Sequence, residues 1–406
     1  MTNLDNADVR RCDVLIAGAG ITGLVAGLGF AAAGFDVVSC GAVERTRRGR
    51  TVALLDSSVA YLNTLGAWAA IETLAAPMRG LRLIDDTGGL FPQRPVEFKS
   101  SEIGLDAFGW NIENERLADA LSARAAETPL LERTALSVKD YDFSQGGAVA
   151  RLEDGRAIAA RLVIGADGRG SPARRAAGLE TRTRRFSQTA LTALIAHRLP
   201  HCDFSTEFHT RGGPFTLVPL RATDAAPHRS SLVWVMSNEE ARRREALDDA
   251  ALAREIEGQA RSMLGTIRLD SERGLFPTML QTAPKITAER LALVGDAAHA
   301  LPPIGAQGLN LGLRDVAAIV GVSRLARAEG RDIGGADAFE AYERMRRSDI
   351  LLRSLAVDGL NSVLLARFPL LDLARAGGLS ALSGIGPLRR FVMRLGVGPN
   401  PTVGTC

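Results

Sequence analysis

A glycine-rich segment near the start of this 406-residue sequence has the spacing of a phosphate-binding turn. The segment reads Gly18-Ala-Gly20-Ile-Thr-Gly23. The first glycine permits a tight turn, the second lets the backbone approach a pyrophosphate, and the third lets a helix pack closely on a strand. The free N–H groups at the start of that helix attract the anion. We therefore predict that Gly18, Gly20, Ile21, Thr22 and Gly23 bind a dinucleotide.

Two further segments place an aspartate beside a glycine directly after an apolar run. Asp167-Gly168 follows residues 162–166, and Gly295-Asp296 follows residues 291–294. Both runs are typical of buried strands. A loop rich in proline and glycine at 302–308 then leads into a helical pattern. Each aspartate is therefore expected where a strand ends.

The three motifs match, in order, the GxGxxG, DG and GD fingerprints of flavoprotein aromatic hydroxylases. The sequence resembles the single-component monooxygenase family that includes p-hydroxybenzoate hydroxylase, over essentially its whole length. The resemblance implies bound FAD and, because only one GxGxxG is present, NAD(P)H that docks transiently and leaves. Oxygen would form a flavin C4a-hydroperoxide that hydroxylates an electron-rich aromatic ring. Since the flavin performs this chemistry, no side chain is assigned a catalytic role; an oxidase is the competing interpretation.

The resemblance also assigns cofactor contacts. Asp296 would accept hydrogen bonds from the ribityl hydroxyls, and Gly295 would keep the backbone close enough for that contact. The loop that follows would open a helix beside the flavin ring and direct N–H groups at its electron-rich edge, which stabilises negative charge on reduced flavin. Further FAD-binding positions are expected at Asp167, Gly168, Pro303, Gly305, Ala306, Gly308, Leu309 and Asn310.

Two arginines and the end of the second strand complete the expected site. Arg50 fits the family position that contacts the cofactor, and Arg116, near a helix start, is a candidate for the pyrophosphate side. The adenosine ribose usually binds an acidic residue about 20 residues after the glycines. Here residues 39–42 read Ser-Cys-Gly-Ala, and the nearest acid is Glu44. Either Glu44 or the backbone around Gly41 holds the ribose; we favour the backbone.

Other residues that invite a catalytic role are explained better by structure. His299 follows the GD motif but is expected to be positional, because the flavin carries out the oxygen chemistry. Trp110 and Trp234 are interpreted as core or pocket-wall residues. The sequence contains no Ser/His/Asp or Cys/His hydrolytic arrangement and no metal-ligand spacing, and its four cysteines form no CxxC motif.

The hydrophobic pattern predicts the elements that hold these motifs. A strand, the glycine turn, a helix and a second strand form a β-α-β unit at the N-terminus. Residues 185–285 contain mainly alternating strands, typical of an antiparallel sheet. Parallel strands are predicted at 12–17, 35–40, 161–166 and 290–294, and helices at 24–33, 57–74, 113–128, 248–263, 309–328 and most of the remainder.

We expect an α/β fold in which a Rossmann-like FAD-binding domain with a parallel sheet is interleaved with an antiparallel-sheet substrate domain and followed by a helical C-terminal region. Because Gly18 and Asp296 must meet around one cofactor, the chain leaves the FAD-binding domain and returns to it. The expected FAD-binding parts are 1–75, 111–184 and 286–335. The substrate domain is expected at 76–110 and 185–285, and the helical region at 336–406.

Composition restricts the class of protein. The hydrophobic fraction of 46% and the charged fraction of 23% are those of a folded globular chain. A net charge of +3 argues against a nucleic-acid partner. No apolar run reaches the ~20 residues that span a bilayer. Because the N-terminus shows no signal peptide, we expect a cytoplasmic protein.

The strands and the tail favour one branch of the family. Residues 213–220, 231–234 and 342–349 resemble the ubiquinone-biosynthesis hydroxylases, which implies a polyprenylated phenol as substrate. A hydroxylase of a soluble aromatic or polyketide-like compound is one alternative. A non-catalytic flavin-binding scaffold of a quinone-synthesis complex is another.

The last helical segment, residues 388–395, is amphipathic. Its apolar residues share one helical face and its arginines the other. Such a helix would rest on an anionic membrane surface, on the inner face of the inner membrane, where a polyprenylated phenol is delivered. Packing on the domain is the alternative. The apolar face comprises Leu388, Phe391, Val392 and Leu395, and the basic face Arg389, Arg390 and Arg394.

Overall fold

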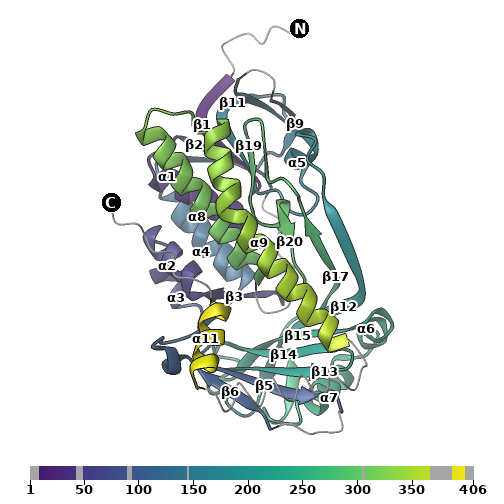
Figure 1. The fold of residues 1–406 in the computed structure, drawn as a ribbon. Helices are drawn as coiled ribbons and strands as arrows, with labels where there is room; N and C mark the ends of the chain where they lie inside the picture. The colour runs from purple at the N-terminus through teal and green to yellow at the C-terminus, as the bar shows by residue number, and fades with distance from the viewer. Residues whose placement is uncertain are drawn as a thin grey trace.

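The computed structural model describes residues 9–42, 49–88, 94–143, 146–303, 307–365 and 386–397. Within these residues the strands form sheets of eight, nine and three strands. Figure 1 shows the eight-stranded sheet towards one end of the molecule and the nine-stranded sheet at the other. Helix α9 (Ala336–Leu365) runs lengthwise between the two ends (Figure 1).

The eight-stranded sheet contains β1 (Val9–Ala17), β2 (Val37–Cys40), β8 (Leu131–Thr134), β9 (Val138–Asp142), β10 (Ala148–Leu152), β11 (Ala157–Gly165), β18 (Thr287–Ala288) and β19 (Leu291–Leu293). The central order β19-β11-β1-β2-β8 is parallel throughout. The carboxyl ends of β1, β11 and β19 therefore meet at one edge, which is where ligands bind in open parallel sheets.

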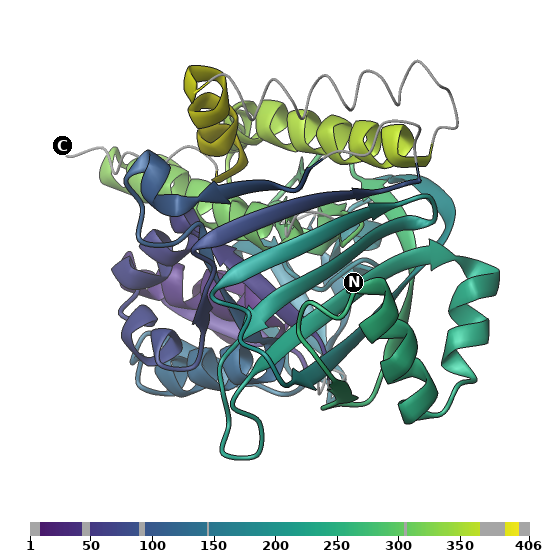
Figure 2. The same ribbon diagram turned by 90° about the horizontal axis from the view of Figure 1, so that it is seen from below.

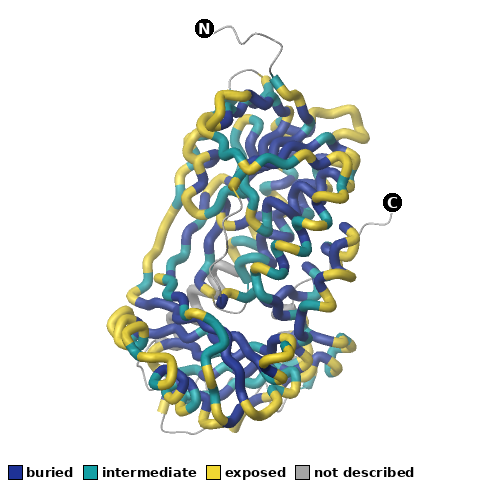
Figure 3. Tube along the Cα trace, turned by 180° about the vertical axis from the view of Figure 1, so that it is seen from behind, coloured by how far each residue is buried: buried dark blue, intermediate teal, exposed yellow. Residues whose placement is uncertain are grey.

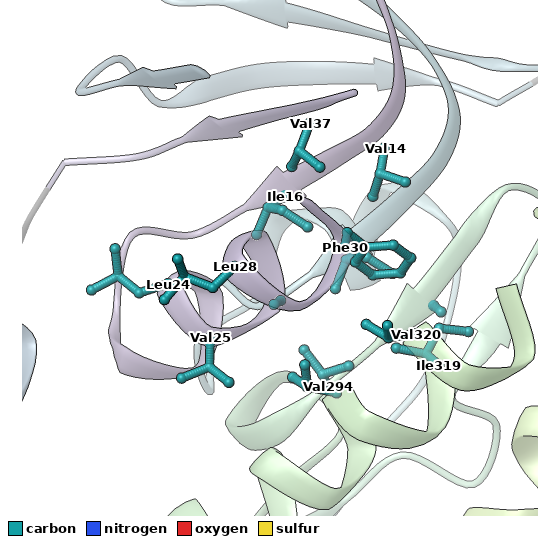
Figure 4. Packing of buried hydrophobic residues seen from close by; sticks show 14 of the residues in the cluster. Val14, Ile16, Leu24, Val25, Leu28, Phe30, Val37, Val294, Ile319 and Val320 are labelled. Carbon is teal, nitrogen blue, oxygen red and sulfur yellow. The ribbon is translucent and has the colours of Figure 1, made fainter. Parts of the chain in front are cut away.

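Helices cover this sheet and bury its core. α1 (Ile21–Ala32) lies against β1, and α8 (Gln307–Ala328) and α4 (Asn114–Ala126) pack beside α1. Figure 4 shows Val14 and Ile16 of β1 with Phe30 of α1 and Ile319 and Val320 of α8. Each fully buried side chain of this kind contributes roughly 1.5–3 kcal/mol. Because both faces of the strand are covered, the apolar run of β1 is continuous rather than alternating.

The nine-stranded sheet contains β5 (Gly80–Asp86), β6 (Val96–Lys99), β12 (Arg182–His197), β13 (Phe204–Thr210), β14 (Gly213–Leu220), β15 (Arg229–Ser237), β16 (Ile267–Leu269), β17 (Gly274–Thr282) and β20 (His299–Ala300). α6 (Asn238–Glu245) and α7 (Asp249–Gln259) cover one face, as seen in Figure 2. The first residues of β12 are exposed where this long strand runs between the two ends (Figure 3).

The pairing in this sheet differs from the expected pattern at one point. β13 and β5 are parallel, whereas the other pairs are antiparallel. The long connection between β5 and β13 passes through the eight-stranded sheet, and only such a long crossover permits a parallel pair.

A small third sheet, which the sequence pattern did not predict, joins the two large ones. It contains β3 (Thr51–Leu55), β4 (Ala76–Pro77) and β7 (Gly109–Glu113) and carries the short helices α2 (Asp56–Thr64) and α3 (Trp68–Glu72). Arg229 of β15 donates to Glu113 at 3.0 Å and to Asp270 at 2.6 Å. This buried guanidinium therefore connects the small sheet to the nine-stranded sheet.

The C-terminal helix α11 (Gly386–Val397) packs on β6 through an unexpected face. Met393 is buried against Val96 and Phe98, and the Arg389 guanidinium lies 4.4 Å from the Phe98 ring centroid. Arg389 also bonds Glu102 at 2.6 Å. Phe391, from the predicted apolar face, is 60% exposed. Arg389 of the predicted basic face thus contacts the domain, in line with the packing alternative, whereas Arg390 and Arg394 are exposed. No described helix is long and apolar enough to cross a membrane.

Candidate functional site

The three glycines of the first motif have different surroundings. A Cβ on Gly18, whose φ is +123°, would lie 2.3 Å from the Ala166 carbonyl oxygen, and one on Gly23 would lie 2.0 Å from the Gly18 oxygen. A Cβ on Gly20 would meet nothing within 4 Å. Helix α1 begins directly after Gly20 without a side-chain cap and without an acidic residue in its first turn. An open space before free N–H groups fits a pyrophosphate.

Asp167 lies beside this turn, at the end of β11. Its Oδ2 accepts a hydrogen bond from the Ala173 N–H at 2.9 Å, in the first turn of α5 (Pro172–Ala176). Its Oδ1 is buried and has no hydrogen-bond partner among the described residues. Burial raises the pKa of Asp167. Gly168 follows with a φ of +77°, a conformation that favours glycine.

The Gly295-Asp296 turn packs tightly against α1, the helix that follows the first glycine motif. Gly295 has a φ of +58°, and a Cβ there would lie 3.1 Å from Thr22. A Cβ on Gly312 of α8 would lie 3.0 Å from the Gly295 Cα. Gly312 is not among the residues predicted from the sequence. A glycine four residues after Gly308 in a helical pattern does, however, indicate that another backbone approaches the helix closely.

Asp296 has the environment expected of a ligand-binding carboxylate. Its side chain is exposed at the surface, but the protein around it is dense, and this burial raises the pKa of Asp296. The charges of Arg169 and Arg50 act in the opposite direction. Arg50 in turn lies 4.9 Å from the centroid of the Phe276 ring, on β17 of the nine-stranded sheet. The carboxylate is thus free to accept hydrogen bonds from hydroxyl groups, and a sheet from each end of the molecule contributes to its surroundings.

Asn310 binds protein rather than open space. Its Oδ1 accepts from the Leu55 N–H at 2.9 Å and from the Ser58 hydroxyl at 2.6 Å, and its Nδ2 donates to the Ala53 oxygen at 2.7 Å. The side chain therefore fixes the start of α8 to β3 and α2. Gly308 and Leu309, just before it, are half-buried, and Pro303 is exposed. Gly305 and Ala306 lie outside the described residues.

The backbone around Gly41 touches the first glycine turn. The Gly18 N–H donates to the Cys40 oxygen at 2.8 Å. A Cβ on Gly41, whose φ is +147°, would lie 3.0 Å from the Ala19 nitrogen. Glu44, the alternative for the ribose, lies outside the described residues. Arg116 lies in the first turn of α4 and pairs with Glu113 at 3.5 Å. Its role and that of Gly41 stay predictions.

A buried polar cluster lies behind the Gly295-Asp296 turn. Asp315 of α8 has no exposed surface and accepts hydrogen bonds from the Gly295 N–H at 3.0 Å, from His299 Nε2 at 2.6 Å and from Arg346 Nε at 2.7 Å. His299 is equally buried, which fits a positional role. Asp315 and Arg346 were not identified from the sequence. The signal was a charged residue among the apolar residues of a helix.

Trp110 and Trp234, which were predicted to be core or pocket-wall residues, both lie in packed environments. Trp234 packs edge-on against Phe215 with ring centroids 5.0 Å apart, and Arg244 lies 4.1 Å above its ring. Trp110 packs edge-on against Trp68 at 5.5 Å. Among the described residues no cluster of histidine, cysteine or acidic side chains could hold a metal ion.

The chain matches the family model described as FAD binding domain over residues 11–349. It is 32% identical to ubiquinone hydroxylase UbiL of Rhodospirillum rubrum, over 97% of this chain and 92% of the relative. It is 28% identical to 3-demethoxyubiquinol 3-hydroxylase of Escherichia coli, over 95% and 98% of the two chains. Among solved structures, p-nitrophenol 4-monooxygenase PnpA from Pseudomonas putida superposes with a TM-score of 0.78 at 17% identity, covering 95% of this chain and 97% of that one.

The fold and these matches define a flavoprotein monooxygenase. The chain belongs to the FAD-binding monooxygenase family that includes p-hydroxybenzoate hydroxylase. It is therefore an FAD-dependent aromatic hydroxylase that uses O2. The predictions of fold class, of FAD as cofactor and of enzyme class are confirmed.

Proposed function

We propose that this chain hydroxylates the aromatic ring of a polyprenylated phenol in ubiquinone biosynthesis, with NAD(P)H as a transient reductant. The observation that carries the proposal is the similarity to two relatives named for ubiquinone hydroxylation, each covering more than nine-tenths of this chain. Bound FAD supplies the electron transfer and the activation of O2. The protein binds the cofactor, orients it and excludes water.

The described residues fit these tasks. Gly20 leaves room for a pyrophosphate in front of the α1 N–H groups, and Asp296 offers a carboxylate to ribityl hydroxyls. Arg50 places a positive charge near Asp296, where it opposes the effect of burial on the pKa of this aspartate. The Arg50 guanidinium also lies over the Phe276 ring. Together they are proposed to hold FAD beside the nine-stranded sheet.

The sheet face opposite α6 and α7 suits an aromatic ring. Val233 of β15 pairs with Thr192 of β12 on one side and with Thr216 of β14 on the other, so the three side chains form a row. Val233, Thr216 and Phe276 are only half-buried, which leaves apolar surface available. The Thr192 hydroxyl is buried and has no hydrogen-bond partner in the described part of the chain. We propose that this row contacts the substrate ring and that Thr192 bonds its phenolic oxygen.

Turnover of the FAD-loaded protein tests the activity. A polyprenylated phenol should stimulate NAD(P)H and O2 consumption and gain one oxygen atom, detected by mass spectrometry. Stimulation only by soluble phenols would favour the alternative hydroxylase, and hydrogen peroxide without hydroxylated product would indicate an oxidase. If no phenol stimulates NAD(P)H consumption, the flavin-binding scaffold becomes the better description.

A strain lacking the gene tests the pathway. Accumulation of a prenylated phenol would identify the substrate and the ring position. An unchanged quinone pool would contradict the ubiquinone assignment.

Contact with an anionic membrane surface, and with a quinone-synthesis complex, is part of the proposal. Phe391, Arg390 and Arg394 of α11 are exposed and form an apolar and basic surface next to the contact made by Met393. The holoenzyme should co-sediment with phosphatidylglycerol vesicles, and Phe391→Asp should reduce binding. Equal binding of both proteins, or none to any vesicle, would reject the membrane contact.

A further inference from the structure

The turn that carries Asp296 is held from behind by Asp315. One oxygen of this buried carboxylate, Oδ2, accepts from the Gly295 N–H at 3.0 Å and from His299 Nε2 at 2.6 Å. Because a carboxylate oxygen can only accept, His299 carries its proton on Nε2. A backbone N–H adjacent to the expected FAD ligand is thus fixed by a side chain that faces away from the cofactor.

The other oxygen of Asp315 is held by a different helix. Oδ1 accepts from Arg346 Nε of α9 at 2.7 Å, and Arg346 Nη1 lies 2.9 Å from Asp349. Asp349 also accepts from Arg314 Nε of α8, at 2.9 Å. The two carboxylates and the two guanidinium groups balance in charge. Such a cluster is stable only when every member is present, because a buried carboxylate without its partner is strongly unfavourable.

Helix α9 also bonds the strand that precedes the Gly295-Asp296 turn. Its Tyr342 hydroxyl donates to the Leu293 oxygen at 2.8 Å, at the end of the strand that leads into Gly295. The same helix continues past the eight-stranded sheet and contacts β14 of the nine-stranded sheet (Figure 1). Any displacement of α9 is transmitted to the turn through Asp315 and Leu293.

We propose that Asp315 and Arg346 are positioning residues for the FAD site: together they set the Gly295-Asp296 turn and make FAD affinity depend on the seating of α9. The proposal rests on the FAD binding of the family and not on the identity of the aromatic substrate.

Two double variants separate positioning from core filling. Asp315→Asn with Arg346→Met removes both charges but keeps an oxygen that accepts from Gly295 and His299. Asp315→Leu with Arg346→Met removes the same charges and the acceptor as well. The two proteins differ only in the group that faces the turn, and replacing a buried ion pair by apolar groups of similar volume is tolerated by many folds.

The readout is FAD affinity of the apoprotein, measured by quenching of flavin fluorescence, with circular dichroism and melting of the apoprotein as the check on folding. The Leu/Met variant should bind FAD about tenfold or more weakly than the Asn/Met variant, because only the latter keeps an oxygen that accepts from Gly295. The bound flavin of the Leu/Met variant should also show a shifted absorption spectrum. Equal affinity and equal spectra for the two variants would overturn the proposal.

Single variants keep the test valid if the Leu/Met protein does not fold. Arg346→Lys retains the charge but cannot bond Asp315 and Asp349 with the same fork. We expect it to lower FAD affinity, whereas Arg347→Gln, an exposed neighbour on the same helix, should leave affinity unchanged. An Arg346→Lys protein that binds FAD like the wild type would reject the role of α9. Because no phenol is present, a failure here leaves the proposed hydroxylation untouched.

Discussion

Gly20 and Gly23 are three residues apart, but only one of them is needed by the fold itself. Gly20 has an extended φ of −71° and open space where a Cβ would stand, whereas a Cβ on Gly23 would collide with the Gly18 oxygen. The two positions therefore allow folding and ligand binding to be measured separately.

Gly20→Ala should lower the free energy of unfolding of the apoprotein by no more than about 1 kcal/mol, because the position has room for a methyl group and the only cost is that alanine is a poorer helix N-cap than glycine. FAD affinity should fall about tenfold or more, since the added methyl occupies the expected pyrophosphate space. Gly23→Ala should instead destabilise the apoprotein by about 1–3 kcal/mol through overcrowding. Urea unfolding and fluorescence titration measure both effects. Unaltered FAD binding in Gly20→Ala would contradict the assignment of this turn.

A buried histidine outside the FAD site makes stability depend on pH. His197 Nδ1 donates to the Leu199 oxygen at 2.8 Å, and its Nε2 accepts from the Ser230 hydroxyl at 3.0 Å. Burial lowers the pKa of His197 to about 4. The unfolded chain, with an ordinary pKa near 6.5, binds the proton first as the pH falls.

The stability that the neutral His197 contributes is therefore complete above about pH 6.5 and is lost as the pH falls towards about 4. As the pH falls from about 7.5 to about 5, the free energy of unfolding should decrease by about 2 kcal/mol because of this histidine. His197→Asn keeps a donor for Leu199 and removes the titration, so its unfolding free energy should change less over the same range. If the variant shows the full wild-type pH dependence, other groups are responsible.

At this scale the sequence predicts residues whose role is local. The GxGxxG, DG and GD glycines are recognisable because turn geometry is encoded by neighbouring residues. Asp315 and Arg346 were not recognisable from the sequence. They are 31 residues apart, and their side chains meet only when α8 and α9 pack. Asn310 is different: its side chain binds β3 and α2, which its motif position does not reveal, and its FAD contact stays a prediction.

Among elements, the small sheet depends on Arg229. This guanidinium is 6% exposed and bonds Glu113 of β7 and Asp270, so it connects two sheets. Arg229→Met should lower the unfolding free energy by about 2–4 kcal/mol, because it leaves two partly buried carboxylates with only the longer 3.5 Å pairs to Arg116 and Arg268.

Arg243→Met is the matched control. Arg243 pairs with Glu240 and Glu255 on the surface, where ion pairs contribute little, so its loss should have little or no effect on stability. Denaturant unfolding of both variants gives the comparison. A similar loss in the two proteins would show that Arg229 does not connect the sheets.

Elements with strong periodicity or a local turn signal were predictable. The N-terminal β-α-β unit, β11, β19, α7 and α8 lie within a few residues of their predicted positions. The small sheet and the parallel β13–β5 pair were not, since both pair segments distant in sequence. Hydrophobic alternation indicates that a segment is a strand, but not which strand lies beside it.

For the whole molecule, FAD should act as a crosslink between distant parts of the chain. Its expected ligands follow β1, β11 and β19, so binding stabilises the folded state only. At about 100 times its Kd, FAD should contribute about 2.7 kcal/mol and raise the Tm of a chain of this length by about 3 °C. Calorimetry of apoprotein and holoprotein measures the shift. At the same FAD concentration, a tenfold weaker Gly20→Ala protein should show about half of this shift. A wild-type Tm that does not change with FAD would contradict the prediction.

The order of strands also has a consequence for synthesis. Gly165 of β11 pairs with Leu293 of β19, which is made roughly 130 residues later. At about 5–20 residues per second, the ribosome needs roughly 6–26 s to supply that strand. During this interval residues 157–160 of β11 can pair with β10, but residues 163–165 have an edge with no neighbour, and an unpaired strand edge is an aggregation hazard. Chaperone binding to the emerging chain should therefore be strongest after β11 and end once residue 293 has left the exit tunnel.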